Sequence, residues 1–222
     1  VLNAAMTADG KIDTYLRRGA KISSEDDWAR VDQLRADVDA VMIGGRTLLA
    51  EDPRLTVRSE ELRRERTASG RPENPAKVGI ITYADLPPNS RFLTEGGSQV
   101  YLFTTDRTNP RQVEALRARG AEVILSPAQV DLTASMAYLR DAGIERLLLE
   151  GGGTLNAAML ADGLIDEIRV YIAPLIFTGA SAPTLMDGPG LSREQAAVLA
   201  LQNIETMPDG GILVTYLVQP EI

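Results

Sequence analysis

A carboxylate followed by a run of glycines is the part of this sequence best suited to chemistry. Glu150 follows the apolar run Leu147–Leu149 and precedes three consecutive glycines, Gly151–Gly153. Glycines leave backbone N–H groups uncovered, and Thr154–Leu160 is predicted to be a helix whose N-terminus faces the same place. A phosphate could rest there, while Glu150 at the end of its strand would point toward the rest of the ligand. A tight strand-to-helix turn without a ligand is the alternative, and this stretch alone favours neither.

A second glycine turn repeats the pattern. Gly44-Gly45-Arg46-Thr47-Leu48 and Gly151–Leu155 both follow an apolar strand and both end on Thr-Leu. Neither matches the dinucleotide fingerprint G-x-G-x-x-G or the P-loop pattern. Two such turns suggest a ligand long enough to touch both, such as a dinucleotide, although an accidental echo of this length also explains them.

Composition limits the chemistry that is open to the chain. The sequence has 222 residues with 44% hydrophobic content, which predicts one domain over residues 1–222, or two at most. It contains no histidine and no cysteine, which excludes histidine-based triads, thiol nucleophiles and the usual zinc sites. Catalysis must therefore use carboxylates, Lys, Tyr, Ser or Thr, or a bound cofactor, and no metal is expected.

Charge and hydropathy limit the partners. The net charge of −8 and the pI near 4.7 argue against nucleic acid or an acidic membrane, because such partners need a surplus of Lys and Arg. An anionic ligand would need a local basic pocket. The sequence has no signal peptide and no apolar run of membrane-spanning length, so a cytoplasmic location is expected.

Strands and helices are predicted to alternate along most of the chain. The predicted strands are Val1–Met6, Val41–Ile43, Val78–Thr82, Val100–Thr104, Glu122–Leu125 and Ile168–Ala173. The predicted helices include Glu25–Ala36, one that starts at Asn109-Pro110 and ends at Gly120, and Leu132–Ala142. Ala196–Glu205 and Ile212–Val218 are predicted to form an antiparallel hairpin. The charged stretch Ser59–Ala76 is predicted to be a surface loop with at most a turn of helix and no chemistry. This order predicts an α/β domain whose mostly parallel sheet becomes antiparallel at one edge.

Several segments, in order along the chain, resemble the reductase domain family of riboflavin biosynthesis. They are Asn3–Lys11, Ile22–Ser24, Leu34–Ala36, Gly44–Arg58, Leu149–Leu155 and Tyr171–Pro174. The resemblance implies a dihydrofolate-reductase-like α/β fold, with a mostly parallel central sheet flanked by helices and a C-terminal antiparallel hairpin. It also implies a homodimer, for which the strand Ile168–Ile172 and the terminal hairpin could supply an interface, although each could equally be core.

The activity implied by the resemblance is reduction of a ribosylaminopyrimidine 5′-phosphate to its ribitylamino form, by hydride transfer from NADPH to C1′. The family also occurs fused to a zinc deaminase, which would need the His and Cys residues that this chain lacks, so the stand-alone form is expected. Asn3 stands where fused bacterial enzymes tend to carry Lys, which favours the diamino substrate. The deaminated substrate, and NADH in place of NADPH, remain open.

The resemblance also implies site residues. The cofactor contacts implied are Ala5, Lys21, Thr47, Glu51, Gly152, Gly153, Thr154, Leu155 and Asn156, and the substrate contacts are Asn3, Gly19, Arg35, Leu55, Arg58 and Glu150. Glu51 is a departure, because the family more often has Asp there. The residues give independent support: in an acidic chain, Arg35 and Arg58 form a cationic pair suited to a 5′-phosphate.

Glu150 is the predicted catalytic residue, orienting the ribose hydroxyls and moving the proton needed for ring opening. Lys11 and Asp52 are weaker candidates for that proton, and Arg46, Lys77, Arg91 and Arg107 are possible neighbours of a cofactor 2′-phosphate. Two alternatives remain: a pterin or dihydrofolate-type reductase on the same fold, which would have less use for the arginine pair, and a catalytically inactive NADPH-binding protein.

Overall fold

A computed structural model describes residues 1–219 of the chain. The chain divides into two compact units: unit 1 comprises Val1–Arg30 and Leu149–Ile222, and unit 2 comprises Val31–Leu148. The chain passes between the units inside helix α1 (Glu25–Asp37) and inside strand β6 (Leu147–Leu149). The single domain expected over 1–222 stays a prediction.

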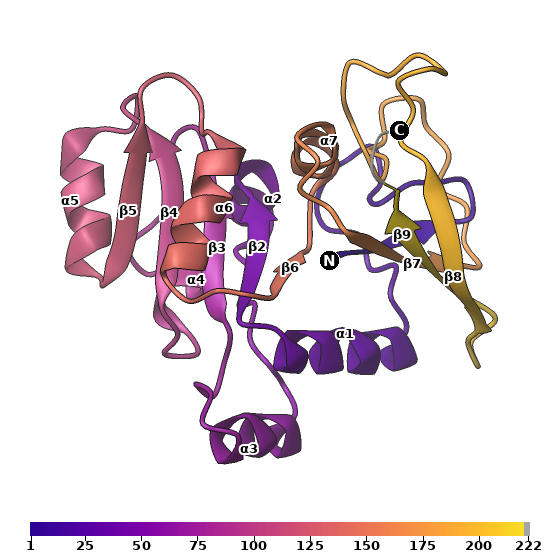
Figure 1. Ribbon diagram of the computed structural model, residues 1–222, viewed down its shortest axis with the longest axis horizontal. Coiled ribbons are helices and arrows are strands. Elements are labelled where there is room, and N and C mark those ends of the chain that lie inside the picture. The colour runs from indigo at the N-terminus through magenta and orange to yellow at the C-terminus, as the bar shows by residue number, and fades with distance from the viewer. Residues whose placement is uncertain (220–222) are drawn as a thin grey trace. The chain divides into compact units, whose positions relative to one another are not determined.

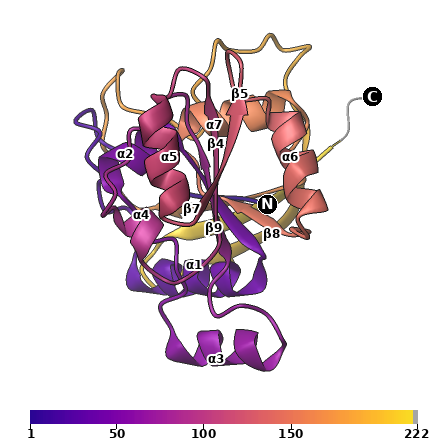
Figure 2. The same ribbon diagram turned by 90° about the vertical axis from the view of Figure 1, so that its left-hand side faces the viewer.

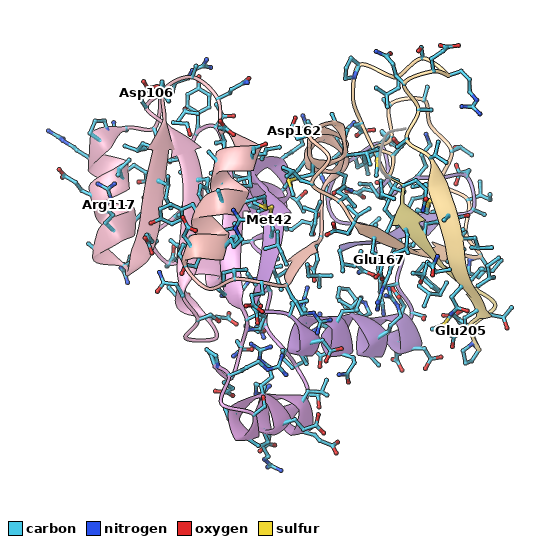
Figure 3. All side chains as sticks on the ribbon, in the orientation of Figure 1. Met42, Asp106, Arg117, Asp162, Glu167 and Glu205 are labelled. Atoms are coloured by element: carbon cyan, nitrogen blue, oxygen red, sulfur yellow. The ribbon has the colours of Figure 1, made fainter. Side chains whose placement is uncertain are left out.

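Unit 2 is built on a parallel sheet with strand order β5-β4-β3-β2. Its elements are β2 (Ala40–Gly44), α2 (Gly45–Glu51), α3 (Glu60–Ala68), β3 (Ala76–Ile80), α4 (Arg91–Thr94), β4 (Val100–Thr105), α5 (Pro110–Ala118), β5 (Ala121–Ser126) and α6 (Leu132–Asp141). Figure 2 shows α5 on one side of these strands and α6 on the other. Because both faces are covered, β2 and β4 are buried along their whole length, as Met42 on β2 illustrates in Figure 3.

The helices of unit 2 begin and end where local signals place them. Asn109 accepts a hydrogen bond from the amide of Arg111 at the start of α5, which has proline at its first position. Asp131 caps α6 in the same way through the amide of Ala134. Gly120, just after α5, adopts the left-handed conformation that ends helices, with φ of 85°.

Unit 1 contains the remaining strands, in the order β6-β1-β7-β9-β8 (Figure 1). Its elements are β1 (Leu2–Thr7), α7 (Gly153–Ala161), β7 (Glu167–Ala173), β8 (Leu199–Thr206) and β9 (Ile212–Val218), together with Leu149, the last residue of β6. β1 pairs in parallel with β6 and β7, whereas β9 pairs antiparallel with β7 and β8. A core cluster of Ile22, Tyr171, Ala173 and Leu213 packs at these strands.

The predicted fold class is confirmed: the strand pairings are mostly parallel, helices flank the strands, and the last two strands form an antiparallel hairpin. Two local predictions were wrong. Ser59–Ala76 contains the nine-residue helix α3, which follows an N-cap at Ser59. The predicted strand Val78–Thr82 ends earlier, at Ile80. Along the described residues, none of the helices is long and apolar enough to cross a membrane.

Candidate functional site

The glycine turn after β6 leads directly into α7, and no side chain caps the start of this helix. Gly151 has φ of 94°, and the Gly151–Gly152 peptide bond is cis. Gly152 is the N-cap of α7, and no side chain caps the helix there. The first amides of a helix have no partner within the helix, and its N-terminus carries partial positive charge. This is the arrangement that the sequence predicted for a phosphate-bearing ligand.

Gly153 is required by a close approach of another segment. A Cβ atom on Gly153 would lie 2.4 Å from the carbonyl oxygen of Thr184 and 3.1 Å from the Asp187 carboxyl carbon. The amide of Asp187 donates to the Gly153 carbonyl at 3.0 Å, and the Asn156 Nδ2 donates to the Leu185 carbonyl at 2.8 Å. The segment 184–187 therefore packs directly on the first turn of α7 and sets its position.

Replacing Gly153 with Ala is expected to lower the free energy of unfolding by about 2 kcal/mol, because backbone rather than a flexible side chain must move to make room. NADPH affinity is expected to fall as well. Gly188→Ala is the matched control: its nearest obstacle is the Ala157 Cβ at 3.3 Å, so a smaller loss is expected. Urea unfolding and cofactor titration measure both effects, and equal losses in the two variants would contradict this reading.

Asn3 and Glu150 lie on neighbouring strands of unit 1. Leu2 pairs with Leu149 in the parallel register, so Asn3 and Glu150 are the next residues along β1 and just beyond β6. Neighbouring strands lie about 4.8 Å apart, which brings these two side chains to one place. Asn3 is only 6% exposed, yet its Oδ1 has no hydrogen-bond partner among the described residues, and the same holds for Asn156 Oδ1 on α7. Buried polar atoms are rarely left unpaired, so these oxygens fit a bound ligand.

The loop after β1 carries two more predicted residues, Gly19 and Lys21. The Asp13 carboxylate accepts hydrogen bonds from the amides of Gly19 and Ala20, both at 2.9 Å, and from Thr14 at 2.7 Å. One buried carboxylate therefore closes this loop on itself and fixes Gly19 next to the exposed Lys21. Ala5, on β1, packs against the core cluster of unit 1.

Both predicted phosphate ligands, Arg35 and Arg58, belong to unit 2. Arg35, in the last turn of α1, is 7% exposed, and its Nη1 donates to the Thr56 carbonyl at 3.2 Å. Arg58 lies two residues further along this segment and is exposed. Leu55 is buried with φ of 51°, so the chain turns sharply just before the segment that Arg35 contacts.

The other predicted cofactor residues of unit 2, Thr47 and Glu51, belong to the short helix α2. This helix begins directly after β2 without a side-chain cap, and a Cβ on Gly45 would lie 2.5 Å from the Ile81 side chain. Thr47 lies in its first turn and Glu51 at its end. The Glu51 carbonyl accepts a hydrogen bond from Arg91 Nη2 at 2.8 Å.

Two of the weaker candidates have structural roles. Asp52 accepts hydrogen bonds from the amides of Arg91 and Phe92 at 2.9 and 3.1 Å, so its carboxylate caps α4 rather than supplying a proton. Lys77 is fully buried, and its Nζ donates to main-chain carbonyls of α4 and of Glu95, so it cannot reach a 2′-phosphate.

Within residues 1–219, no group of three or more acidic side chains is placed to hold a metal ion.

The sequence interpretation missed the residues that fix the Arg58 segment from the side of α3. Arg63 Nη1 donates to the carbonyls of Val57 and Arg58 at 3.0 and 2.7 Å. Arg66 is 1% exposed and donates to the carbonyls of Ala36 and Val38 at 2.7 and 2.8 Å, just beyond Arg35. The signals for α3 were present: Ser59 precedes two glutamates, and Glu60 forms an ion pair with Arg64 one turn later.

A solved structure shares the fold of this chain. A pyrimidine reductase-like protein from Corynebacterium diphtheriae has the same fold, with a TM-score of 0.84 over 99% of this chain and 91% of its own, at 21% sequence identity. At this identity the likeness shows that the two chains share a fold.

The family is defined more narrowly by sequence. The family model of the RibD C-terminal domain matches residues 1–213, and the chain belongs to that family. Two relatives are named 2,5-diamino-6-ribosylamino-4(3H)-pyrimidinone 5′-phosphate reductase. The one from Methanothermobacter thermautotrophicus is 41% identical over 99% of this chain and 97% of its own length. The one from Archaeoglobus fulgidus is 36% identical over 94% of this chain and 93% of its own.

Proposed function

We propose that this chain reduces 2,5-diamino-6-ribosylamino-4(3H)-pyrimidinone 5′-phosphate to the ribitylamino compound with NADPH. The observation that carries the proposal is the near full-length match to two reductases with that name. The chemistry of the chain supports it, since the reaction needs a phosphate site, a nucleotide site and a proton carrier, but neither histidine nor a thiol.

The reaction divides into ring opening and reduction. In ring opening, the C1′–O4′ bond of the aminoriboside breaks, O4′ takes a proton, and the nitrogen on C1′ loses one to give an imine. In reduction, C1′ accepts a hydride and the nitrogen takes a proton from solvent. Bound NADPH supplies the hydride. The net reaction consumes substrate, NADPH and one proton, and yields the ribitylamino product and NADP⁺.

The residues of the chain bind, orient and move protons. In the proposal, Glu150 orients the ribose hydroxyls and carries the proton from the nitrogen on C1′ to O4′. Arg35 and Arg58 hold the 5′-phosphate through charge-assisted hydrogen bonds, with Gly19 and Leu55 beside the substrate. The uncapped start of α7 at Gly152–Asn156 takes the pyrophosphate, with Ala5, Lys21, Thr47 and Glu51 as further cofactor contacts.

Asn3 supports the diamino substrate. Its buried Oδ1 has no partner among the described residues and is an acceptor, which suits an amino group. Deamination replaces one amino group of the substrate with a carbonyl, which is itself an acceptor, and two facing acceptors cannot hydrogen-bond.

The decisive assay supplies the diamino and the deaminated ribosylaminopyrimidine phosphates separately and follows the absorbance of the reduced cofactor. The diamino compound is expected to give a kcat/KM at least about tenfold higher, since a mismatched buried polar group costs at least that much. A pterin or dihydrofolate oxidising NADPH instead would support the alternative reductase, and NADPH binding without any turnover would support the inactive binder.

NADPH is proposed over NADH, and the same assay with NADH tests this choice. Arg46 and Arg107 follow β2 and β4, the two strands that pair with β3 on either side, so both cations lie beyond one end of this parallel sheet. A 2′-phosphate would find a cationic neighbourhood there. Equal kcat/KM with NADH would remove this assignment.

A homodimer is also proposed, together with a cytoplasmic location. β7 is paired on both sides, by β1 and β9, so neither of its edges is open to a strand of a second copy. The hairpin differs, because Leu201 and Ile204 on β8 are 53% and 57% exposed. Exposed apolar side chains on an edge strand favour an interface in which a second copy of the chain buries them. Sedimentation velocity giving only the monomer mass would refute the dimer.

Arg58→Ala is expected to raise KM for the phosphorylated substrate by about 30-fold, because one charge-assisted contact to phosphate is lost. The side chain is exposed, so the free energy of unfolding should change little. Steady-state kinetics and urea unfolding measure both, with Arg64→Ala on the exposed face of α3 as control. An unchanged KM would remove Arg58 from phosphate binding.

A further inference from the structure

Asp32 makes a pair of hydrogen bonds that tie α1 to the segment carrying Arg58. Its Oδ1 accepts from the amide of Arg58 at 2.6 Å, and its Oδ2 accepts from the amide of Ser59 at 2.7 Å. The side chain is 7% exposed. Both carboxylate oxygens are therefore committed to backbone amides that lie 26 and 27 residues further along the chain.

Asp32 and Arg35 are one turn apart on α1 and act on the same segment. Residues three apart lie on one face of a helix. Asp32 accepts from Arg58 and Ser59, while Arg35 donates to the Thr56 carbonyl at 3.2 Å. This one helix face thus holds the backbone of residues 56–59 on both sides of Val57.

Other side chains hold the same backbone from outside α1. Arg63 donates to the carbonyls of Val57 and Arg58, and Asn74 Oδ1 accepts from the amide of Val57 at 2.9 Å. The peptide groups around Arg58 are therefore fixed, while the Arg58 side chain itself is exposed. Because this backbone is already fixed, little of its conformational entropy is lost when the Arg58 side chain binds an anion.

We propose that Asp32 is a positioning residue for the phosphate of the substrate, setting the Arg58 guanidinium at a fixed place relative to Arg35. The inference rests on the proposed function. A carboxylate close to a phosphate site would ordinarily repel the anion. Here both oxygens of Asp32 accept hydrogen bonds from backbone amides, so its role in the proposal is to fix the segment that carries Arg58.

The test compares two substrates that differ only in the phosphate. In Asp32→Asn, the amide nitrogen cannot accept from a backbone N–H, so one tie is lost. The ratio of kcat/KM for the phosphorylated substrate to that for its dephosphorylated form is expected to fall about tenfold, the loss of one hydrogen bond to a charged group. Calorimetric titration with ribose 5-phosphate in the absence of cofactor should show the same tenfold loss of affinity.

Two controls separate positioning from stability. Ser59→Ala removes the hydroxyl that caps α3 but keeps the amide that Asp32 holds, so it should lower the unfolding midpoint and leave the ratio unchanged. Glu61 is an exposed carboxylate in the first turn of α3. Glu61→Gln makes the same charge change as Asp32→Asn and should leave the unfolding midpoint and the kcat/KM ratio unchanged. If Asp32→Asn does not fold, Asp32→Glu keeps the charge but displaces the oxygens, and its ratio should also fall.

The outcomes are distinct. A lower ratio together with weaker ribose 5-phosphate binding supports the proposal. Equal losses for both substrates, or an unchanged ratio, would mean that Asp32 only stabilises the fold. If the wild-type chain turns over neither substrate, the proposed function fails, whereas ribose 5-phosphate titration still reports whether Asp32 positions a phosphate site.

Discussion

Glu150→Gln is expected to lower kcat by about 100-fold while changing NADPH affinity by less than about threefold. Gln keeps the size of the side chain and its capacity to hydrogen-bond, but it cannot take or give the proton that ring opening requires. The neighbouring start of α7, which is proposed to bind the cofactor, is untouched by the substitution. Turnover with the diamino substrate and equilibrium titration with NADPH measure the two quantities separately.

Glu145→Gln provides the matched control for this substitution. Glu145 is an exposed carboxylate five residues before Glu150 in the sequence, and it has no proposed role in the reaction. Its replacement makes the same change in net charge and should leave kcat unaltered. A Glu150→Gln variant with wild-type kcat would show that another group, or water, moves the proton.

Lys77→Met is expected to lower the free energy of unfolding by about 3 kcal/mol near neutral pH. The Lys77 Nζ donates to the carbonyls of Phe92 at 2.9 Å, Glu95 at 2.5 Å and Arg91 at 3.4 Å, and the side chain is fully buried. Methionine fills similar volume but removes the donor that these carbonyls share, although the Arg91 carbonyl keeps the amide of Glu95 at 3.0 Å. Urea unfolding measures the loss.

The same lysine predicts a dependence on pH. Burial lowers the pKa of Lys77 to about 8 from the model-compound value of 10.5, and the nearby Glu95 and Asp52 carboxylates offset only part of this. Between about pH 8 and pH 10.5 the unfolded chain holds this proton and the folded chain does not, so this group raises the free energy of unfolding as pH rises. The free energy of unfolding of the wild type, measured relative to that of Lys77→Met, should therefore rise across that window by up to about 3 kcal/mol.

Lys11→Met is the control for the loss of a lysine charge near neutral pH. Lys11 is half-buried, and its side chain has no charge partner among the ion pairs of the described residues. Its loss should change the free energy of unfolding by about 0.5 kcal/mol or less near neutral pH. A difference between wild type and Lys77→Met that stays constant with pH would show that Lys77 keeps its proton throughout.

The fold could be predicted from the sequence wherever local patterns and burial agree. β4 begins with the apolar run Val100–Phe103 and is followed by α5, which Asn109 caps, and the strand lies where the sequence placed it. The hairpin of β8 and β9 followed from a Pro-Asp-Gly-Gly turn between strand-like runs. α3 was missed because its sequence is almost entirely charged and has no apolar stripe. Arg66 holds this helix in place: its side chain is buried and donates hydrogen bonds to the carbonyls of Pro72, Ala36 and Val38.

The candidate site was proposed from residue types, and these roles stay predictions, whereas the contacts that hold its segments in place were not foreseen. The glycine turn at Gly151–Gly153 and the arginines at positions 35 and 58 were chosen because their residue types suit phosphate binding. Asp13 and Asp32 look like ordinary surface carboxylates in the sequence. Their roles come from backbone amides that only the folded chain brings to them. No periodicity or spacing encodes such contacts.

The origin of the hydrogen at C1′ tests the proposed function most directly. The chain is incubated with the diamino ribosylaminopyrimidine phosphate and with NADPH carrying deuterium at either face of nicotinamide C4, and the product is analysed by mass spectrometry. A ribitylamino product that carries deuterium at C1′ from one labelled cofactor and none from the other is the predicted result. Absence of the ribitylamino product, or a product without deuterium from either cofactor, would contradict direct hydride transfer by this protein.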